Sequence, residues 1–139
     1  MALDFELQDN NSKEIPNDYR IGYMGFGFLR QSLAHHISDE FDYHYTQMYK
    51  NLFDNKVHID WLNKYEQEHE EQQPIISALF FHSDCDGEWN KEEIDVLVEW
   101  LQVHKPKEQP DDTKRDFIEE YEGLLKMLQT PNLYKVIFC

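Results

Sequence analysis

The six residues LYKVIF, 133–138, are almost all apolar and follow a Thr-Pro-Asn breaker at 130–132. This pattern predicts a strand. Near the other end of the sequence, LDFEL, residues 3–7, alternates apolar and polar side chains and predicts a second strand. A lone strand would leave its backbone donors and acceptors unpaired. We therefore expect these two segments to pair with each other or with residues 15–23.

Between these strands, apolar residues recur at the spacing of amphipathic helices. Such segments lie at residues 26–37, 41–52, 59–65, 94–101 and 117–128. The short apolar segment 75–81 follows Pro74, a residue that suits the first turn of a helix, whereas the turn-rich residues 9–18 predict a loop. We therefore predict an α+β protein with a single globular domain over residues 1–139. It should be mostly helical, with a small sheet formed by the terminal strands.

The composition narrows the kinds of partner that the protein can bind. Of its 139 residues, 40% are hydrophobic and 14% aromatic, enough for a packed core. Its 28 acidic residues outnumber 13 basic ones and give a formal net charge of −15. A surface this negative repels phosphates, which argues against nucleic acid and anionic membranes as partners. It favours cations or basic protein surfaces, and it also serves solubility.

Three features predict a cytoplasmic protein. The first ten residues, MALDFELQDN, lack the basic and apolar regions of a signal peptide. No run of ~18 apolar residues is present that could form a membrane-spanning helix. The two cysteines, Cys85 and Cys139, do not resemble the disulfide framework of a small secreted domain.

The segment HSDCDGEWNKEE, residues 82–93, fits most of a twelve-residue calcium loop. Gly87 stands at the sixth position, where the chain turns sharply, and oxygen-bearing residues occupy most of the ligand positions. The candidate calcium ligands are Asp84, Asp86, Glu88, Asn90 and Glu93. His82 occupies the first position, where an aspartate is usual, and imidazole is a poor ligand for a hard cation. No second loop of this kind occurs in the sequence, although such loops usually work in pairs.

Three other interpretations of the same segment stay open. Asp, Asn and Gly residues also build tight turns without any metal, and Asn90 and Glu93 have the spacing of a capping box. His82 and Cys85 could supply half of a zinc site, completed by a histidine from elsewhere; the candidates are His35, His36 and His44. Cys85 and His82 could also form a nucleophilic pair, provided that the thiol is exposed and its pKa is lowered.

Two motifs resemble a group of small bacterial proteins that have no established activity. GFGFLR, residues 25–30, and HSDCDGE, residues 82–88, match the paired patterns G-F-x-x-F/L-R and H-S-D-C-D-G-E of that group. The chain departs from the pattern at Leu29, where an aromatic residue is commoner, and at Lys91, where proline is often found. The resemblance implies a bacterial origin and a single domain.

These observations lead to an expected function. We expect a non-enzymatic protein-interaction module. Its partner should be a protein, and a basic one if charge governs the contact. Calcium is the only candidate cofactor. The alternative is an acidic inhibitor, an immunity protein or a nucleic-acid mimic that blocks a basic surface. A mimic should gather its carboxylates on one face, whereas the sequence spreads them across every helix. A hydrolytic or metal-dependent enzyme that uses Cys85 or His82 ranks third.

Overall fold

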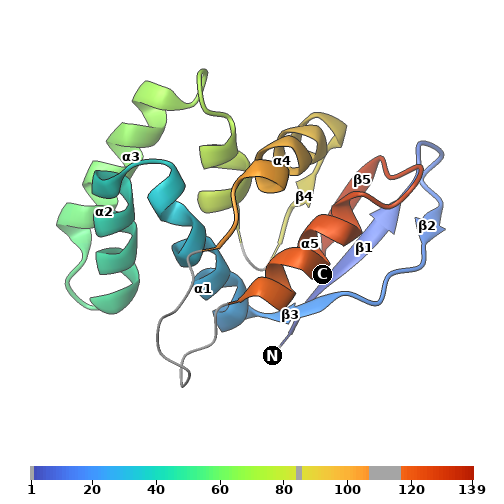
Figure 1. Cartoon of the computed structure of the whole chain (residues 1–139), viewed down its shortest axis with the longest axis horizontal. Coiled ribbons are helices and arrows are strands. Elements are labelled where there is room, and N and C mark those ends of the chain that lie inside the picture. The colour runs from blue at the N-terminus through green and yellow to red at the C-terminus, as the bar shows by residue number, and fades with distance from the viewer. Residues whose placement is uncertain (1, 84–85, 107–116) are drawn as a thin grey trace.

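The computed structural model describes residues 2–83, 86–106 and 117–139, and it confirms the predicted α+β class. A small antiparallel sheet occupies one end of the molecule, while the helices α2 (Asp39–Lys50) and α3 (Lys56–His69) lie at the other end (Figure 1). The described residues include no helix of sufficient length and apolar character to cross a membrane.

The sheet joins the two ends of the chain, as the sequence predicts. Strand β1 (Ala2–Gln8) pairs antiparallel with β5 (Lys135–Phe138), so that Phe5 lies opposite Phe138. β1 also pairs with β2 (Glu14–Ile15) and with β3 (Arg20–Gly22), and β5 pairs on its other side with β4 (Glu88–Trp89). Both expected pairings of the terminal strands therefore occur.

Two of these strands were not predicted. β2 interrupts the segment expected to be a loop, and β4 lies inside the candidate calcium loop. Each is two residues long, too short to show the alternation that identifies a strand in a sequence. They are strands because β1 and β5 offer them unpaired backbone groups.

The helices follow the predicted segments with two local differences. The elements are α1 (Tyr23–Leu33), η1 (Ala34–His36), α2, α3, η2 (Ile76–Phe80), α4 (Lys91–Val103) and α5 (Ile118–Leu128). The expected 26–37 helix is thus α1 continued by the 3₁₀ turn η1. The segment after Pro74 is a single π-helical turn, η2, a form often found where a helix is locally adjusted to its surroundings.

The core is continuous from the sheet to the helices. Leu3, Phe5 and Leu7 lie on one buried face of β1, as their alternation predicts. Trp89 is fully buried and packs edge-to-face on Phe138, with ring centroids 4.7 Å apart. Further buried aromatic rings, Phe41, Tyr45 and Phe80, fill the space between α2 and η2.

Candidate functional site

The segment predicted to be a calcium loop forms a corner between η2 and α4. Gly87, at the bend, has φ = 94°, a conformation that favours glycine, and its carbonyl accepts a hydrogen bond from the Phe138 N–H. The side chains of Asp86 and Glu88 are exposed, and a Glu88 carboxylate oxygen lies 3.6 Å from Lys135 Nζ. Asp84 and Cys85 lie outside the described residues, so the predictions made for them are not tested.

Asn90 and Glu93 form the capping box that their spacing predicts. Asn90 Oδ1 accepts a hydrogen bond of 2.8 Å from the Glu93 N–H, and Glu93 Oε1 accepts one of 3.1 Å from the Asn90 N–H. Both side chains therefore face the backbone at the start of α4. Within the described ranges, no three His, Cys, Asp or Glu side chains gather closely enough to hold a metal ion. Calcium binding by the loop stays a prediction.

His82 fills the inside of the corner. Its Nδ1 lies 2.8 Å from the Ser83 carbonyl oxygen, and its Nε2 lies 3.0 Å from the Glu88 carbonyl oxygen. The ring also packs against Phe138, with centroids 4.5 Å apart. The Glu88 carbonyl is the backbone oxygen that a calcium loop would offer at its seventh position, and in this structure it faces an imidazole nitrogen.

Arg30 connects the two motifs on which the family resemblance rests. Its side chain is only 4% exposed, and Nη1 donates to the carbonyls of Leu79, Phe80 and His82, the last at 2.8 Å. The Leu79 and Phe80 carbonyls belong to the last residues of η2, where helical partners run out, and the His82 carbonyl lies two residues beyond its end. The arginine of GFGFLR therefore holds the chain where HSDCDGE begins.

Gly27, the second glycine of GFGFLR, leaves room for Tyr49 to contact Arg30. A Cβ atom on Gly27 would lie 3.2 Å from Tyr49 Cε1, closer than ordinary van der Waals contact. With glycine at this position, the Tyr49 hydroxyl accepts a 3.0 Å hydrogen bond from Arg30 Nη2. Two further side chains bind carbonyls of η2: the Tyr45 hydroxyl also donates to Phe80, and the Trp89 indole N–H donates to Ala78. The described residues of both motifs thus meet at one hydrogen-bonded corner.

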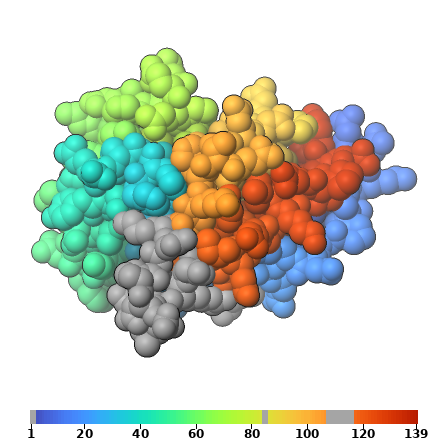
Figure 2. All heavy atoms as spheres, viewed as in Figure 1, coloured from blue at the N-terminus to red at the C-terminus, as the bar shows by residue number. Residues whose placement is uncertain are grey.

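A groove with an acidic rim lies beside this corner, between α4 and the chain that follows α3. Its first part has a volume of about 320 Å³. Glu70 and Glu71 line one side and Glu92 lines the other, while Ala78 and Val96 contribute apolar surface. In Figure 2, the yellow-green surface of the segment after α3 meets the orange surface of α4.

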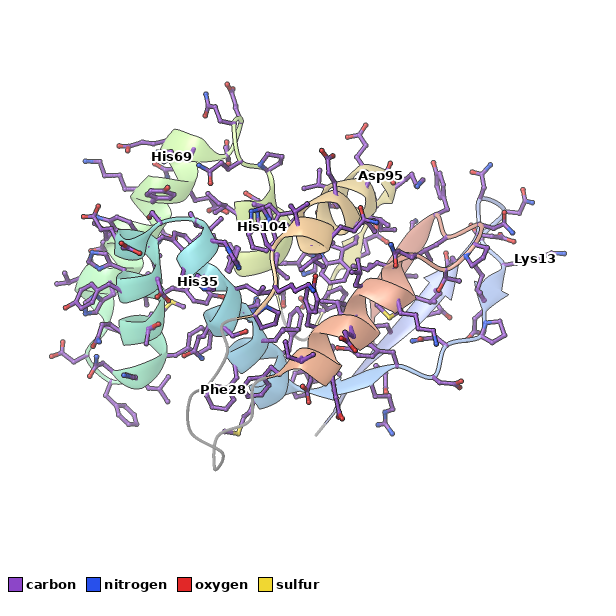
Figure 3. The ribbon with its side chains drawn as sticks, viewed as in Figure 1. Lys13, Phe28, His35, His69, Asp95 and His104 are labelled. Atoms are coloured by element: carbon purple, nitrogen blue, oxygen red, sulfur yellow. The ribbon has the colours of Figure 1, made fainter. Side chains whose placement is uncertain are left out.

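The groove continues toward the C-terminal end of α4. The second part, about 510 Å³, shares Pro74 and Val96 with the first and adds Trp100 and Glu99. His104, labelled in Figure 3 at the end of α4, closes this part, and its ring stacks on Trp100 with centroids 4.2 Å apart. The whole groove therefore offers apolar surface beneath a row of carboxylates.

Negative charge is concentrated in the part of the sequence that supplies both walls of this groove. Residues 65–104 contain eleven Asp and Glu residues but a single basic residue other than histidine, Lys91. Its Nζ lies 2.6 Å from a carboxylate oxygen of Asp95 on the same helix. This local excess was not noted when the sequence was described as spreading its carboxylates across every helix. Counting charges in a moving window along the sequence would have revealed the concentration.

The histidines considered for a zinc site are divided between two places. His36 packs against His104, with ring centroids 4.8 Å apart, and also against His35. His44 packs instead against His58 and Trp61, at the interface of α2 and α3. His82, at the corner, contacts neither group in the described structure.

Comparison with protein-family models, with curated proteins and with solved structures finds no match for this chain. The function is therefore inferred from the geometry and the charge of the chain itself.

Proposed function

We propose that the protein is a non-enzymatic, cytoplasmic interaction module that binds a basic, amphipathic segment of a partner protein in the groove along α4. The observation that carries this proposal is the combination of apolar surface and a glutamate rim in one groove. Apolar side chains of the partner would be removed from water against Val96 and Trp100. Its lysines or arginines would meet the rim and be steered toward it by the surrounding negative field.

The glutamates on the rim of the groove are exposed and available to a cationic partner, which supports this proposal. Glu70, Glu71 and Glu92 are exposed, and with the described residues none of them forms a salt bridge. Like charges placed together on one surface repel one another, and a cationic partner would relieve that repulsion. An amphipathic helix is a common occupant of such grooves because it presents an apolar face and a charged face at once.

A pair of charge-matched variants tests the proposal. In the groove variant, Glu70, Glu71, Glu92 and Glu99 are replaced by glutamine. In the control variant, Glu14 and Glu122 become glutamine and Asp18 and Asp54 become asparagine, so that the same number of exposed charges is lost elsewhere. The probe is a fluorescein-labelled synthetic helix with leucines on one face and lysines on the other, and binding is measured by fluorescence anisotropy.

We expect wild-type protein and the control variant to bind this helix with similar affinity and the groove variant to bind at least about tenfold more weakly. Equal weakening in both variants would show that only net charge matters and would overturn the groove as the site. Absence of binding to the wild-type protein would overturn the proposal as well.

The second candidate is an acidic inhibitor, immunity protein or nucleic-acid mimic, and the concentration of carboxylates in residues 65–104 favours it. Such a protein would use charge alone, so the apolar surface of the groove would be dispensable. Val96→Ser separates the two candidates because it changes the groove without changing its charge. It should weaken binding of the amphipathic helix but leave salt-sensitive binding to a basic nuclease unaffected.

The calcium loop forms a separate part of the proposal. Asp84, Asp86, Glu88, Asn90 and Glu93 would fix the angle between η2 and α4 if an ion joined them. Calorimetric titration of metal-free protein with calcium tests this directly. A heat of binding that Glu93→Gln abolishes would support the loop, and no heat at millimolar calcium would reject it.

A further inference from the structure

Two histidines meet at the interface of α2 and α3. His44 lies on α2 and His58 on α3, two helices that run side by side in Figure 1. Their Nδ1 atoms are 2.9 Å apart, and both side chains are half-buried. Because both hydrogen-bonding atoms are ring nitrogens, one must carry the proton while the other offers its lone pair.

Neighbouring rings hold this pair in position. The ring of His44 stacks on Trp61, with centroids 4.2 Å apart and planes 20° apart. Tyr43 presents its ring edge-on to both histidines, at centroid distances of 5.1 Å and 5.7 Å. Partial burial lowers the pKa of His44, the charge of His58 lowers it further, and Glu40 acts in the opposite direction. The neutral ring is the form that binds metal.

The distance between the nitrogens suits a chelated ion. Two metal–nitrogen bonds of about 2.0–2.1 Å place the nitrogens about 2.9 Å apart at a right angle and about 3.4 Å apart at the tetrahedral angle. The distance between the two nitrogens would therefore change by at most a few tenths of an ångström, and each ring would turn so that its lone pair points at the ion instead of at the other ring. Imidazole nitrogen suits zinc, copper and nickel and is a poor ligand for calcium.

We propose that His44 and His58 form a two-histidine site for a late first-row divalent ion, Zn²⁺ or Cu²⁺, which ties α2 to α3. The ion replaces the proton between the two Nδ1 atoms, and that proton moves to Nε2 of the same ring. Water completes the coordination, since no third His, Cys, Asp or Glu side chain joins the pair within the part of the chain that the structure describes. This site is independent of the calcium loop and of the groove.

Trp61 gives the proposal a specific spectroscopic readout. A Cu²⁺ ion bound to His44 would quench the fluorescence of the indole stacked on that ring. Titrating the metal-free full-length chain with CuCl₂ should therefore quench fluorescence at the first equivalent. Trp61→Phe keeps an aromatic ring beside His44 but removes the reporting indole, so most of this quenching should be lost.

Variants and a direct measurement of the ligands complete the test. Calorimetry with ZnCl₂ should show affinity at least about tenfold lower in both His44→Gln and His58→Gln. His104→Gln is the matched control, because His104 also stacks on a tryptophan, and it should bind like the wild-type protein. Electron paramagnetic resonance of the wild-type copper complex should show two coordinating nitrogens, whether or not the variants fold.

Either of two results would overturn the site. One is a copper spectrum with fewer than two nitrogen ligands at one equivalent. The other is unchanged zinc affinity in folded His44→Gln and His58→Gln proteins, with folding checked by circular dichroism.

Discussion

At the scale of single residues, Arg30 places a positive charge in the interior of a strongly acidic protein. No salt bridge to it occurs with the described residues, and its partners are three carbonyl oxygens and the Tyr49 hydroxyl. Its guanidinium carbon also lies 4.6 Å from the centroid of the Phe26 ring. The two terminal nitrogens of its planar guanidinium reach all these groups at once, which the single ammonium of a lysine could not do.

Arg30→Ala should destabilise the protein by roughly 3 kcal/mol or more, because several buried hydrogen bonds to a charged group are lost together. The measurement is the free energy of unfolding in urea, followed by circular dichroism. Arg20→Ala is the matched control: Arg20 pairs with Asp4 at the surface, where both side chains are more than half exposed. That change should cost less than about 1 kcal/mol. Similar costs for the two variants would contradict the role given to Arg30.

The lowered pKa of His44 should make the stability of the protein depend on pH. Burial and the charge of His58 lower its pKa in the folded state, so below the ordinary value of about 6.5 the unfolded chain binds the proton more readily. The free energy of unfolding should therefore fall as the pH decreases from about 7.5 to about 5. His44→Gln should reduce this decrease, whereas His69→Gln controls for the loss of any helical histidine. An unchanged pH dependence in His44→Gln would contradict the explanation.

At the scale of elements, α4 shows what the sequence can and cannot reveal. Its buried stripe, Ile94, Leu97 and Leu101, and its capping box follow from local spacing and are predictable. Strand β4 precedes it by one residue, but it exists only because β5 lies alongside. The groove escaped prediction for a similar reason. Its two walls, on α4 and after α3, are far apart in the sequence and are brought together by the turn η2 and the corner that Arg30 holds.

Two variants at the start of α4 can distinguish a role of Glu93 in the helix cap from a role in binding a metal ion. Glutamine can replace glutamate in a capping box, so Glu93→Gln should change the free energy of unfolding in calcium-free buffer by less than about 0.5 kcal/mol. Asn90→Ala removes the acceptor for the Glu93 N–H and should cost about 1 kcal/mol. Thermal and urea unfolding of the two variants would provide the comparison. A large loss of stability in Glu93→Gln would show that its carboxylate does more than cap the helix.

At the scale of the whole molecule, the net charge of −15 opposes folding, because the folded state brings like charges together. The ion pairs described at the surface are few, and most join residues within a single helix. Their contribution is too small to offset repulsion across the molecule. The acidic surface therefore carries a cost in stability, which is consistent with a role in binding a cationic partner.

Salt should accordingly stabilise the protein. Raising NaCl from about 10 mM to about 150 mM shortens the screening length from about 30 Å to about 8 Å, so repulsion between distant carboxylates is largely removed. We expect the melting temperature to rise by about 2–5 °C, as measured by circular dichroism. The rise should be smaller in the groove variant than in the control variant of equal charge, because the groove variant removes charges from residues 65–104, which hold eleven acidic residues and a single lysine. Equal rises in the two variants would mean that the repulsion is spread evenly over the surface and that the groove is not its centre.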